Sequence, residues 1–169
     1  KQGLTAVYYT DAAFTTPLKI STNTASVNPT AGSEDTPYVN WSANGYRLPT
    51  EAEWEYTARY IDGTTFMRGD APSGWQDNNP VNGLVDAAEN NSVAWYTTNS
   101  GAATHPVGTA VGNALGFFDM SGNVLELVWD WNAAYTTAAP YTDADSRGPT
   151  SGTYRMSRGG SWFALATSL

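Results

Sequence analysis

Apolar and polar residues alternate most clearly over residues 123–131, NVLELVWDW. One face of this segment carries Leu125, Leu127, Trp129 and Trp131, and the other carries Val124, Glu126, Val128 and Asp130. A period of two residues predicts a half-buried β-strand. We expect the face with the leucines and tryptophans to pack in the core.

A helical pattern occupies residues 48–59, LPTEAEWEYTAR. Thr50 and Glu53 have the spacing of a capping box, which marks the first turn of a helix. Trp54 and Ala58 are four residues apart and share one face. The sequence therefore predicts an α-helix that begins after Thr50 and ends near Arg59. The alternating glutamates at its start lie around the helix, where its dipole favours them, and do not form an acid–base pair.

The other elements are short. We expect strands at residues 6–9, 18–20, 38–41, 92–96 and 154–157, and loops at 21–37, 62–91, 99–116 and 132–153, where turn residues dominate. The pair Gly159-Gly160 follows the last strand, and glycines beside a tryptophan indicate a close approach of the backbone to another part of the chain. Abundant aromatic residues and few helix formers favour a loop-rich α+β fold. A length of 169 residues indicates a single domain.

Composition excludes several classes of function. The net charge of -8 argues against nucleic-acid binding, which needs clustered lysine and arginine. The sequence has no cysteine, so disulfides, thiolate metal sites and cysteine nucleophiles are all absent. Its one histidine, His105, has no evident nucleophile to serve, and we interpret it as a loop residue that bonds nearby backbone. No apolar run approaches the roughly 20 residues of a membrane-spanning helix, so this chain contains no transmembrane segment.

Two pairs of carboxylates could carry chemistry. Asp119 and Glu126 bracket a glycine-containing turn and could supply hard oxygen ligands to calcium, although their spacing alone favours a plain turn that leads into a strand. Asp143 and Asp145 stand beside Arg147, and paired carboxylates can hydrolyse a glycoside. Such a pair arises easily by chance in an acidic chain, so it carries little weight.

Four sequence blocks point to a known family. They are NGYRLPTEAEWEY (44–56), THPVGT (104–109), NALGFFDMSGNV (113–124) and RGGSW (158–162). In this order and spacing they resemble the formylglycine-generating enzyme (sulfatase-modifying factor) family. The resemblance implies the C-type lectin fold of that family, an α+β fold that is loop-rich, with short twisted antiparallel sheets and few helices. It also implies a domain that is incomplete at both ends of this chain.

The same resemblance argues against catalysis. Active members of the family carry two cysteines just after Gly-Gly-Ser-Trp, and these positions are Ala164 and Leu169 here. We therefore expect no enzyme activity of the family's type and no copper, since thiolate ligands are missing. Related iron enzymes use a set of histidines, which one histidine cannot provide.

The family also has a calcium site. Carried over to this sequence, its ligands are the side chains of Asp119 and Glu126 and the carbonyl groups of Gly122 and Val124. The resemblance thus implies structural calcium as the one cofactor. Leu125 and Leu127 replace the tryptophans that are usual in the family. They alternate with the ligand positions, so the replacements affect core packing more than the calcium ligands.

Among the family's branches, the chain looks most like the variable proteins of diversity-generating retroelements. Their variable segment begins just after Gly-Gly-Ser-Trp, which makes Phe163, Ala164, Leu165, Thr167 and Ser168 the variable positions here, around a fixed Ala166. All five residues can arise from an AAC codon by replacement of its adenines.

This resemblance implies a non-catalytic ligand-binding protein with a sequence-diversified C-terminal surface. We expect it on a bacterial cell surface or outside the cell, for example as a lipoprotein, with a protein or a glycan as its ligand. Two alternatives stay open: an undiversified pseudoenzyme or accessory domain of the family, and an enzyme with chemistry that needs no cysteine.

Overall fold

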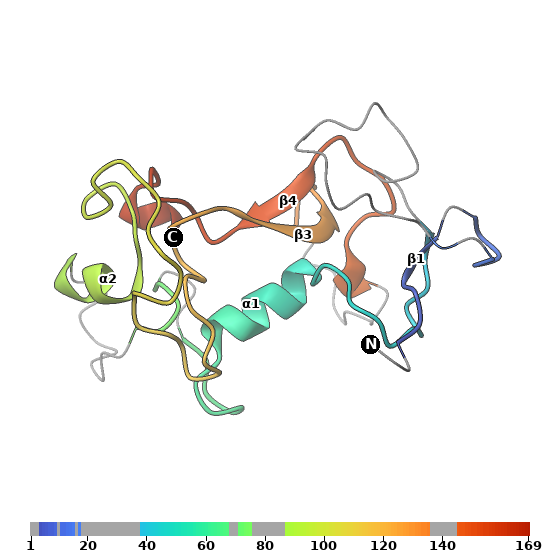
Figure 1. The fold of residues 1–169 in the computed structure, drawn as a ribbon, viewed down its shortest axis with the longest axis horizontal. Coiled ribbons are helices and arrows are strands. Elements are labelled where there is room, and N and C mark those ends of the chain that lie inside the picture. Colours follow the sequence, from blue (N-terminus) through green and yellow to red (C-terminus); the bar gives the residue numbers. More distant parts are fainter. Residues whose placement is uncertain are drawn as a thin grey trace. The chain divides into compact units, whose positions relative to one another are not determined.

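A computed structural model describes residues 4–9, 11–15, 17, 38–67, 71–75, 87–135 and 145–169 (Figure 1). The chain forms two compact units, Lys1–Leu48 and Pro49–Leu169. The strand predicted at 18–20 and the loop predicted at 21–37 lie outside the described residues. That the chain is a single domain stays a prediction.

The described residues of the first unit include a small two-stranded sheet. Strand β1 (Tyr8–Tyr9) pairs antiparallel with strand β2 (Tyr38–Val39). Val7 and Tyr9 are buried, and the ring of Tyr9 lies 5.3 Å from that of Phe14. The pairing of β1 with β2 confirms strands within the segments 6–9 and 38–41, and each strand is shorter than its sequence pattern indicated.

Helix α1 (Glu51–Arg59) opens the second unit, and its boundaries agree with the prediction. The Thr50 hydroxyl accepts a hydrogen bond from the Glu53 amide at 3.2 Å, and the Glu53 carboxylate accepts one from the Thr50 amide at 2.8 Å. This reciprocal pair is the capping box that the sequence indicated. Trp54 and Ala58 are both buried and pack with Met120 and Val128 in the core of the unit.

Strand β3 (Glu126–Trp131) pairs antiparallel with β4 (Arg155–Arg158), and the register changes between Leu127 and Trp131 (Figure 1). Both strands were predicted. The prediction of the buried face was wrong: Val128 and Asp130 are buried at 0% and 6% exposure, whereas Leu125 and Leu127 are 57% and 60% exposed.

A hydrogen bond explains why Asp130 is inside. Its carboxylate accepts from the amide of Glu51, the first residue of α1, at 2.6 Å. This contact satisfies a helix N-terminal amide that otherwise has no partner within the helix. It turns the Val128–Asp130 face of β3 toward α1. Burial, the largest cause, raises the pKa of the Asp130 carboxyl above its ordinary value of 3.8.

The strand predicted at 92–96 is wrong. Helix α2 (Ala87–Val93) ends inside this segment, and Trp95 makes only an isolated bridge to Gly122. Val93, Ala94 and Tyr96 form a second buried cluster, against which Leu169 packs. The apolar residues that resembled a strand therefore belong to a helix end and the turn after it.

Two short 3-10 helices, η1 (Asp145–Arg147) and η2 (Ala166–Ser168), complete the described elements. The described parts of the chain thus have few helices, short antiparallel sheets and long irregular connections, which confirms the loop-rich α+β prediction. No helix among the described residues is long and apolar enough to cross a membrane.

Candidate ligand-binding site

Gly159 and Gly160 direct the chain from β4 into its last nine residues. Both have positive φ, +84° and +71°. A Cβ on Gly159 would lie 2.9 Å from the carbonyl oxygen of Met120, and one on Gly160 would lie 2.5 Å from that of Ser168. Real Cβ atoms do not approach backbone oxygens so closely, and side chains disfavour this backbone conformation. The predicted close approach is confirmed.

The segment after the two glycines, residues 161–169, is called the tail from here on. Its first part is held through its main chain. The amide of Trp162 donates to the carbonyl of Asn123 at 2.9 Å, and the hydroxyl of Ser100 donates to the carbonyl of Trp162 at 2.9 Å. The amide of Thr97 donates to the carbonyl of Ala164 at 3.0 Å. The Thr97 hydroxyl donates to the carbonyls of the first two variable positions, at 2.7 and 2.8 Å. These bonds do not depend on which side chains the variable positions carry.

The side chains predicted to be variable differ in exposure. Phe163 and Leu165 are 72% and 66% exposed. Thr167 and Ser168 are also exposed, and Ala164 is half-buried. Most of these side chains are therefore free to change without filling or emptying a core.

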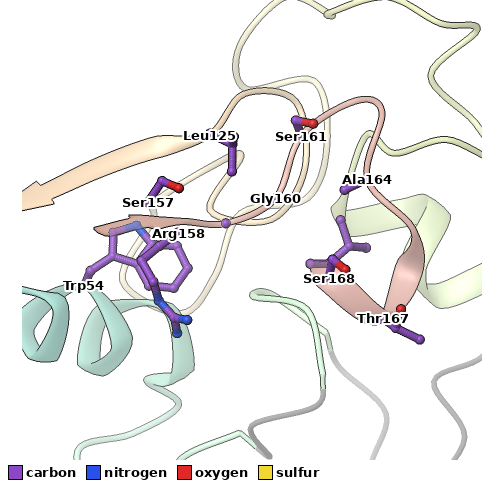
Figure 2. A pocket seen from close by; sticks show the side chains of 11 residues that line it. Trp54, Leu125, Ser157, Arg158, Gly160, Ser161, Ala164, Thr167 and Ser168 are labelled. Carbon is purple, nitrogen blue, oxygen red and sulfur yellow. The ribbon is translucent and has the colours of Figure 1, made fainter. Parts of the chain in front are cut away.

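A pocket of about 540 Å³ lies between β4 and the tail (Figure 2). Its lining consists of Trp54, Leu125, Ser157, Arg158, Gly159, Gly160, Ser161, Ala164, Thr167, Ser168 and Leu169. Figure 2 shows Arg158 and Trp54 on one side of the pocket, and Ala164 and Ser168 on the other. Three of the five predicted variable residues line it, whereas Phe163 and Leu165 do not.

The two positions that the resemblance assigns to catalytic cysteines meet at this pocket. A Cβ on Gly160 would lie 3.4 Å from the Cβ of Ala164 and 3.4 Å from the Cα of Leu169. Ala164 and Leu169 offer only aliphatic side chains there. The pocket therefore has neither a nucleophile nor a thiolate ligand at these positions.

The charge of Arg158, which lines the pocket, is balanced by helix α1. Its guanidinium forms ion pairs with Glu55 and with Glu51, the latter at 3.5 Å. It also lies over the indole ring of Trp54, 4.9 Å from the ring centre. The hydroxyl of Tyr135 donates to Glu51 at 2.5 Å, and this bond is the first cause of the raised pKa of Tyr135. The wall of the pocket thus carries a paired cation.

The side chains of the two carboxylates among the predicted calcium ligands, Asp119 and Glu126, hydrogen-bond to different parts of the chain. The carboxylate of Asp119 accepts from the amide of Gly108 at 2.7 Å, in the loop that carries His105. The carboxylate of Glu126 accepts from the indole nitrogen of Trp54 at 2.5 Å, on α1. Both carboxylates supply the hard oxygen donors that calcium prefers. Each carboxylate already accepts a hydrogen bond, Asp119 from a loop amide and Glu126 from a side chain of α1.

The carbonyl donors of the predicted site belong to Gly122 and Val124. Gly122 donates its amide to the carbonyl of Gly159 at 2.6 Å, and Val124 is 50% exposed. Within the described ranges, no group of three or more acidic or histidine side chains could hold a metal ion. Calcium at Asp119, Gly122, Val124 and Glu126 stays a prediction.

His105 bonds nearby backbone, as the sequence indicated. Its Nε2 lies 2.8 Å from the carbonyl oxygen of Ser100, and its ring stacks on Trp95 with 3.7 Å between the ring centres. Its amide donates to the side chain of Asn123 at 3.0 Å, and Asn123 donates back to its carbonyl at 3.1 Å. In the alternative carboxylate pair, Asp143 lies outside the described residues, so that pair is untested.

Comparison with known proteins decides the family. The model of the sulfatase-modifying factor enzyme 1-like domain matches residues 21–169. The chain belongs to this family. Among curated relatives, it is 38% identical over 136 residues to the formylglycine-generating enzyme of Thermomonospora curvata, a match that covers 74% of the chain and 40% of that protein. It is 36% identical over 141 residues to the chaperone protein LppX of Paenibacillus barcinonensis, which covers 73% and 41%. The chain thus spans about two fifths of the length of these relatives.

The chain is also similar to solved structures, one of which is a variable protein. It matches Treponema denticola variable protein 1 with a TM-score of 0.64 and 39% identity, over 79% of the chain and 42% of that protein. It matches CarF with a TM-score of 0.57 and 30% identity, over 98% of the chain and 51% of that protein. The resemblance to the sulfatase-modifying factor family, including its variable proteins, is confirmed.

Sequence reasoning missed the residues that hold the tail. Thr97, Ser100 and Asn123 supply donors or an acceptor to its main chain. Thr97 and Ser100 lie in a stretch rich in turn residues, and Asn123 begins the alternating segment 123–131, and neither pattern indicates a contact with the tail. The contacts join positions that are more than 35 residues apart, so no local pattern could have indicated them.

Proposed function

We propose that this chain is a non-catalytic ligand-binding protein with a C-type lectin scaffold. It displays Phe163, Ala164, Leu165, Thr167 and Ser168 as a sequence-diversified surface. One observation carries the proposal: framework residues hold the main chain of the tail, while Phe163 and Leu165 are 72% and 66% exposed. A segment held in this way can accept new side chains without refolding.

Two further observations support this function. The chain is similar to a variable protein, over 79% of its length. The positions of the family's catalytic cysteines are aliphatic, Ala164 and Leu169, and the sequence has no other cysteine. A thiolate copper centre therefore has no ligands, and the pocket is left as a binding cavity.

The proposal also covers the location of the protein, the class of its ligand and its cofactor. We place the protein on a bacterial cell surface or outside the cell, with a protein or glycan as its ligand and no nucleic acid. Calcium bound by Asp119, Gly122, Val124 and Glu126 would serve structure, by joining the turn before β3 to the strand itself.

The alternative is an undiversified pseudoenzyme or accessory domain of the family. It is favoured by the 38% identity to a formylglycine-generating enzyme. Genomic sequence separates the two. Diversification requires an adenine-rich near-copy of the segment that encodes residues 157 onward, together with a reverse transcriptase gene. If the locus has neither, diversification is ruled out.

Protein chemistry offers a second test. The five variable positions are randomised to the residues reachable from AAC codons, and the fraction of variants that melt cooperatively is measured. The control library randomises Thr97, Ser100 and Asn123 in the same way. We expect most tail variants to melt within a few degrees of the parent and most control variants to be destabilised. Equal losses in the two libraries would contradict the display function, and clear formylglycine-forming activity would contradict the non-enzyme reading.

A further inference from the structure

The tail turns its side chains to two sides. Phe163 and Leu165 are 72% and 66% exposed and do not line the pocket, whereas Ala164 between them is half-buried and lines it. Extended backbone places successive side chains on opposite sides, and Leu165 is extended, with φ of -75° and ψ of 157°. The alternation of exposed and pocket-lining residues over 163–165 follows from this conformation.

The short helix η2 (Ala166–Ser168) returns the chain to the pocket. Thr167 and Ser168 on this turn both line it (Figure 2). A Cβ on Gly160 would lie 3.4 Å from the Cβ of Ala164 and 2.5 Å from the carbonyl oxygen of Ser168. Two variable residues that are four positions apart therefore flank the same glycine at the pocket.

The pocket has one wall that is constant and one that can change. The constant wall includes Ser157, Arg158 and Ser161, and the changeable wall consists of the three variable residues that line the pocket. Those three are alanine, threonine and serine here, and a larger side chain on this wall would take up part of the 540 Å³. The ring of Phe163 packs elsewhere, edge to face on that of Trp162, with 5.5 Å between the ring centres.

We propose that the five variable residues form two specificity sets. The pocket set is Ala164, Thr167 and Ser168, and it determines which chemical group of a ligand can enter the pocket. The outer set is Phe163 and Leu165, and it contacts the ligand outside the pocket. This inference rests on the proposed function and deepens it. Because the sets lie on different sides of the tail, a change in one set leaves the contacts of the other intact.

Cysteine labelling tests the two-sided arrangement without any ligand. The sequence has no cysteine, so each single-cysteine variant carries one thiol. Variants at the five variable positions are alkylated with N-ethylmaleimide. NMR then follows the indole N–H signal of Trp54, which lines the pocket. V107C is the matched control, since Val107 is 84% exposed and does not line the pocket.

We expect alkylation of A164C, T167C and S168C to shift the Trp54 signal, and alkylation of L165C and V107C to leave it unchanged. Alkylation of F163C should instead shift the indole signal of Trp162, against which the Phe163 ring packs. Thr167 and Ser168 are exposed, so their variants decide the result even if A164C is destabilised. Equal shifts of the Trp54 signal from both sets would overturn the division.

Coupling between positions tests the functional part. The five positions are randomised, and binders are selected on two probes, immobilised lysozyme and a glycan array. In each binder, variable residues are returned to the parent residues singly and in pairs, and Kd is measured. Effects of changes in different sets should multiply to within about twofold, as for independent sites, whereas pairs within the pocket set should deviate by more.

The outcomes separate this inference from the display function. Coupling between the sets as strong as that within the pocket set would overturn the division, while the display function would stand. A library that yields no binder on either probe would contradict the display function, and with it the role of the sets in specificity, even where the indole signals confirm the two-sided tail.

Discussion

The carbonyl oxygen of Ser168 lies 2.5 Å from the point that a Cβ on Gly160 would occupy. Gly160 also has a φ of +71°. We expect G160A to suffer both the clash and the strained backbone. The strain alone costs about 1–3 kcal/mol, and the clash displaces the end of the tail. Urea denaturation of the variant measures the total loss of unfolding free energy.

Gly101 provides the matched control for this substitution. Its φ of +62° is similar, and a Cβ there would meet nothing within 4 Å. G101A therefore carries the backbone strain without the clash. G160A should lose more stability than G101A and should also weaken binding at the pocket. Equal losses in the two variants would show that the contact between Gly160 and Ser168 is unimportant.

Rules based on neighbouring residues correctly predicted the features that depend only on local sequence. The Thr50–Glu53 spacing gave the start of α1, and the glycine pair marked the close approach after β4. Alternation gave β3 but not its buried face, because hydrophobicity favours burial of Leu125 over Asp130. The carboxylate is inside since it satisfies a helix amide contributed from 79 residues away. The pocket likewise depends on contacts between distant segments.

Thr97 should control the order of the tail. T97V keeps the shape of the side chain and removes the hydroxyl that donates to the Phe163 and Ala164 carbonyls. We expect a loss of about 1 kcal/mol in unfolding free energy and faster amide hydrogen exchange in residues 161–168. The control is T57V, which removes a hydroxyl that donates to the Glu53 carbonyl at 2.8 Å within α1. Unchanged exchange in T97V would contradict the role of Thr97.

Asp130 should make stability fall as pH rises. Burial raises its pKa in the folded state above the ordinary 3.8, so the folded protein favours the protonated form. That contribution is present below pH 3.8 and is lost as pH rises through the raised pKa. D130N retains an acceptor for the Glu51 amide and does not titrate. The melting temperature of D130N should therefore rise relative to that of the wild type as pH increases from 4 to 7.

Asp62 serves as a control, because its pKa is shifted in the direction opposite to that of Asp130. Bonds from the amides of Thr64 and Thr65 lower its pKa to about 2. Its contribution is present above pH 3.8 and is lost as pH falls through about 2. D62N should therefore melt at a lower temperature than the wild type at neutral pH, and this difference should disappear in acid.

A difference in melting temperature between D130N and the wild type that stays constant from pH 4 to 7 would show that Asp130 has an ordinary pKa.

Calcium binding should raise the melting temperature through Asp119. A ligand that binds only the folded state stabilises it by mass action, so calcium in excess should raise the melting temperature above that in chelator. D119N removes a charge yet keeps an acceptor for the Gly108 amide, and asparagine tolerates the φ of +57° at this position. We expect D119N to fold and to lose the calcium response, whereas D62N keeps it. No shift in wild type at saturating calcium would exclude the site, because stabilisation by a bound ion cannot be silent in this measurement.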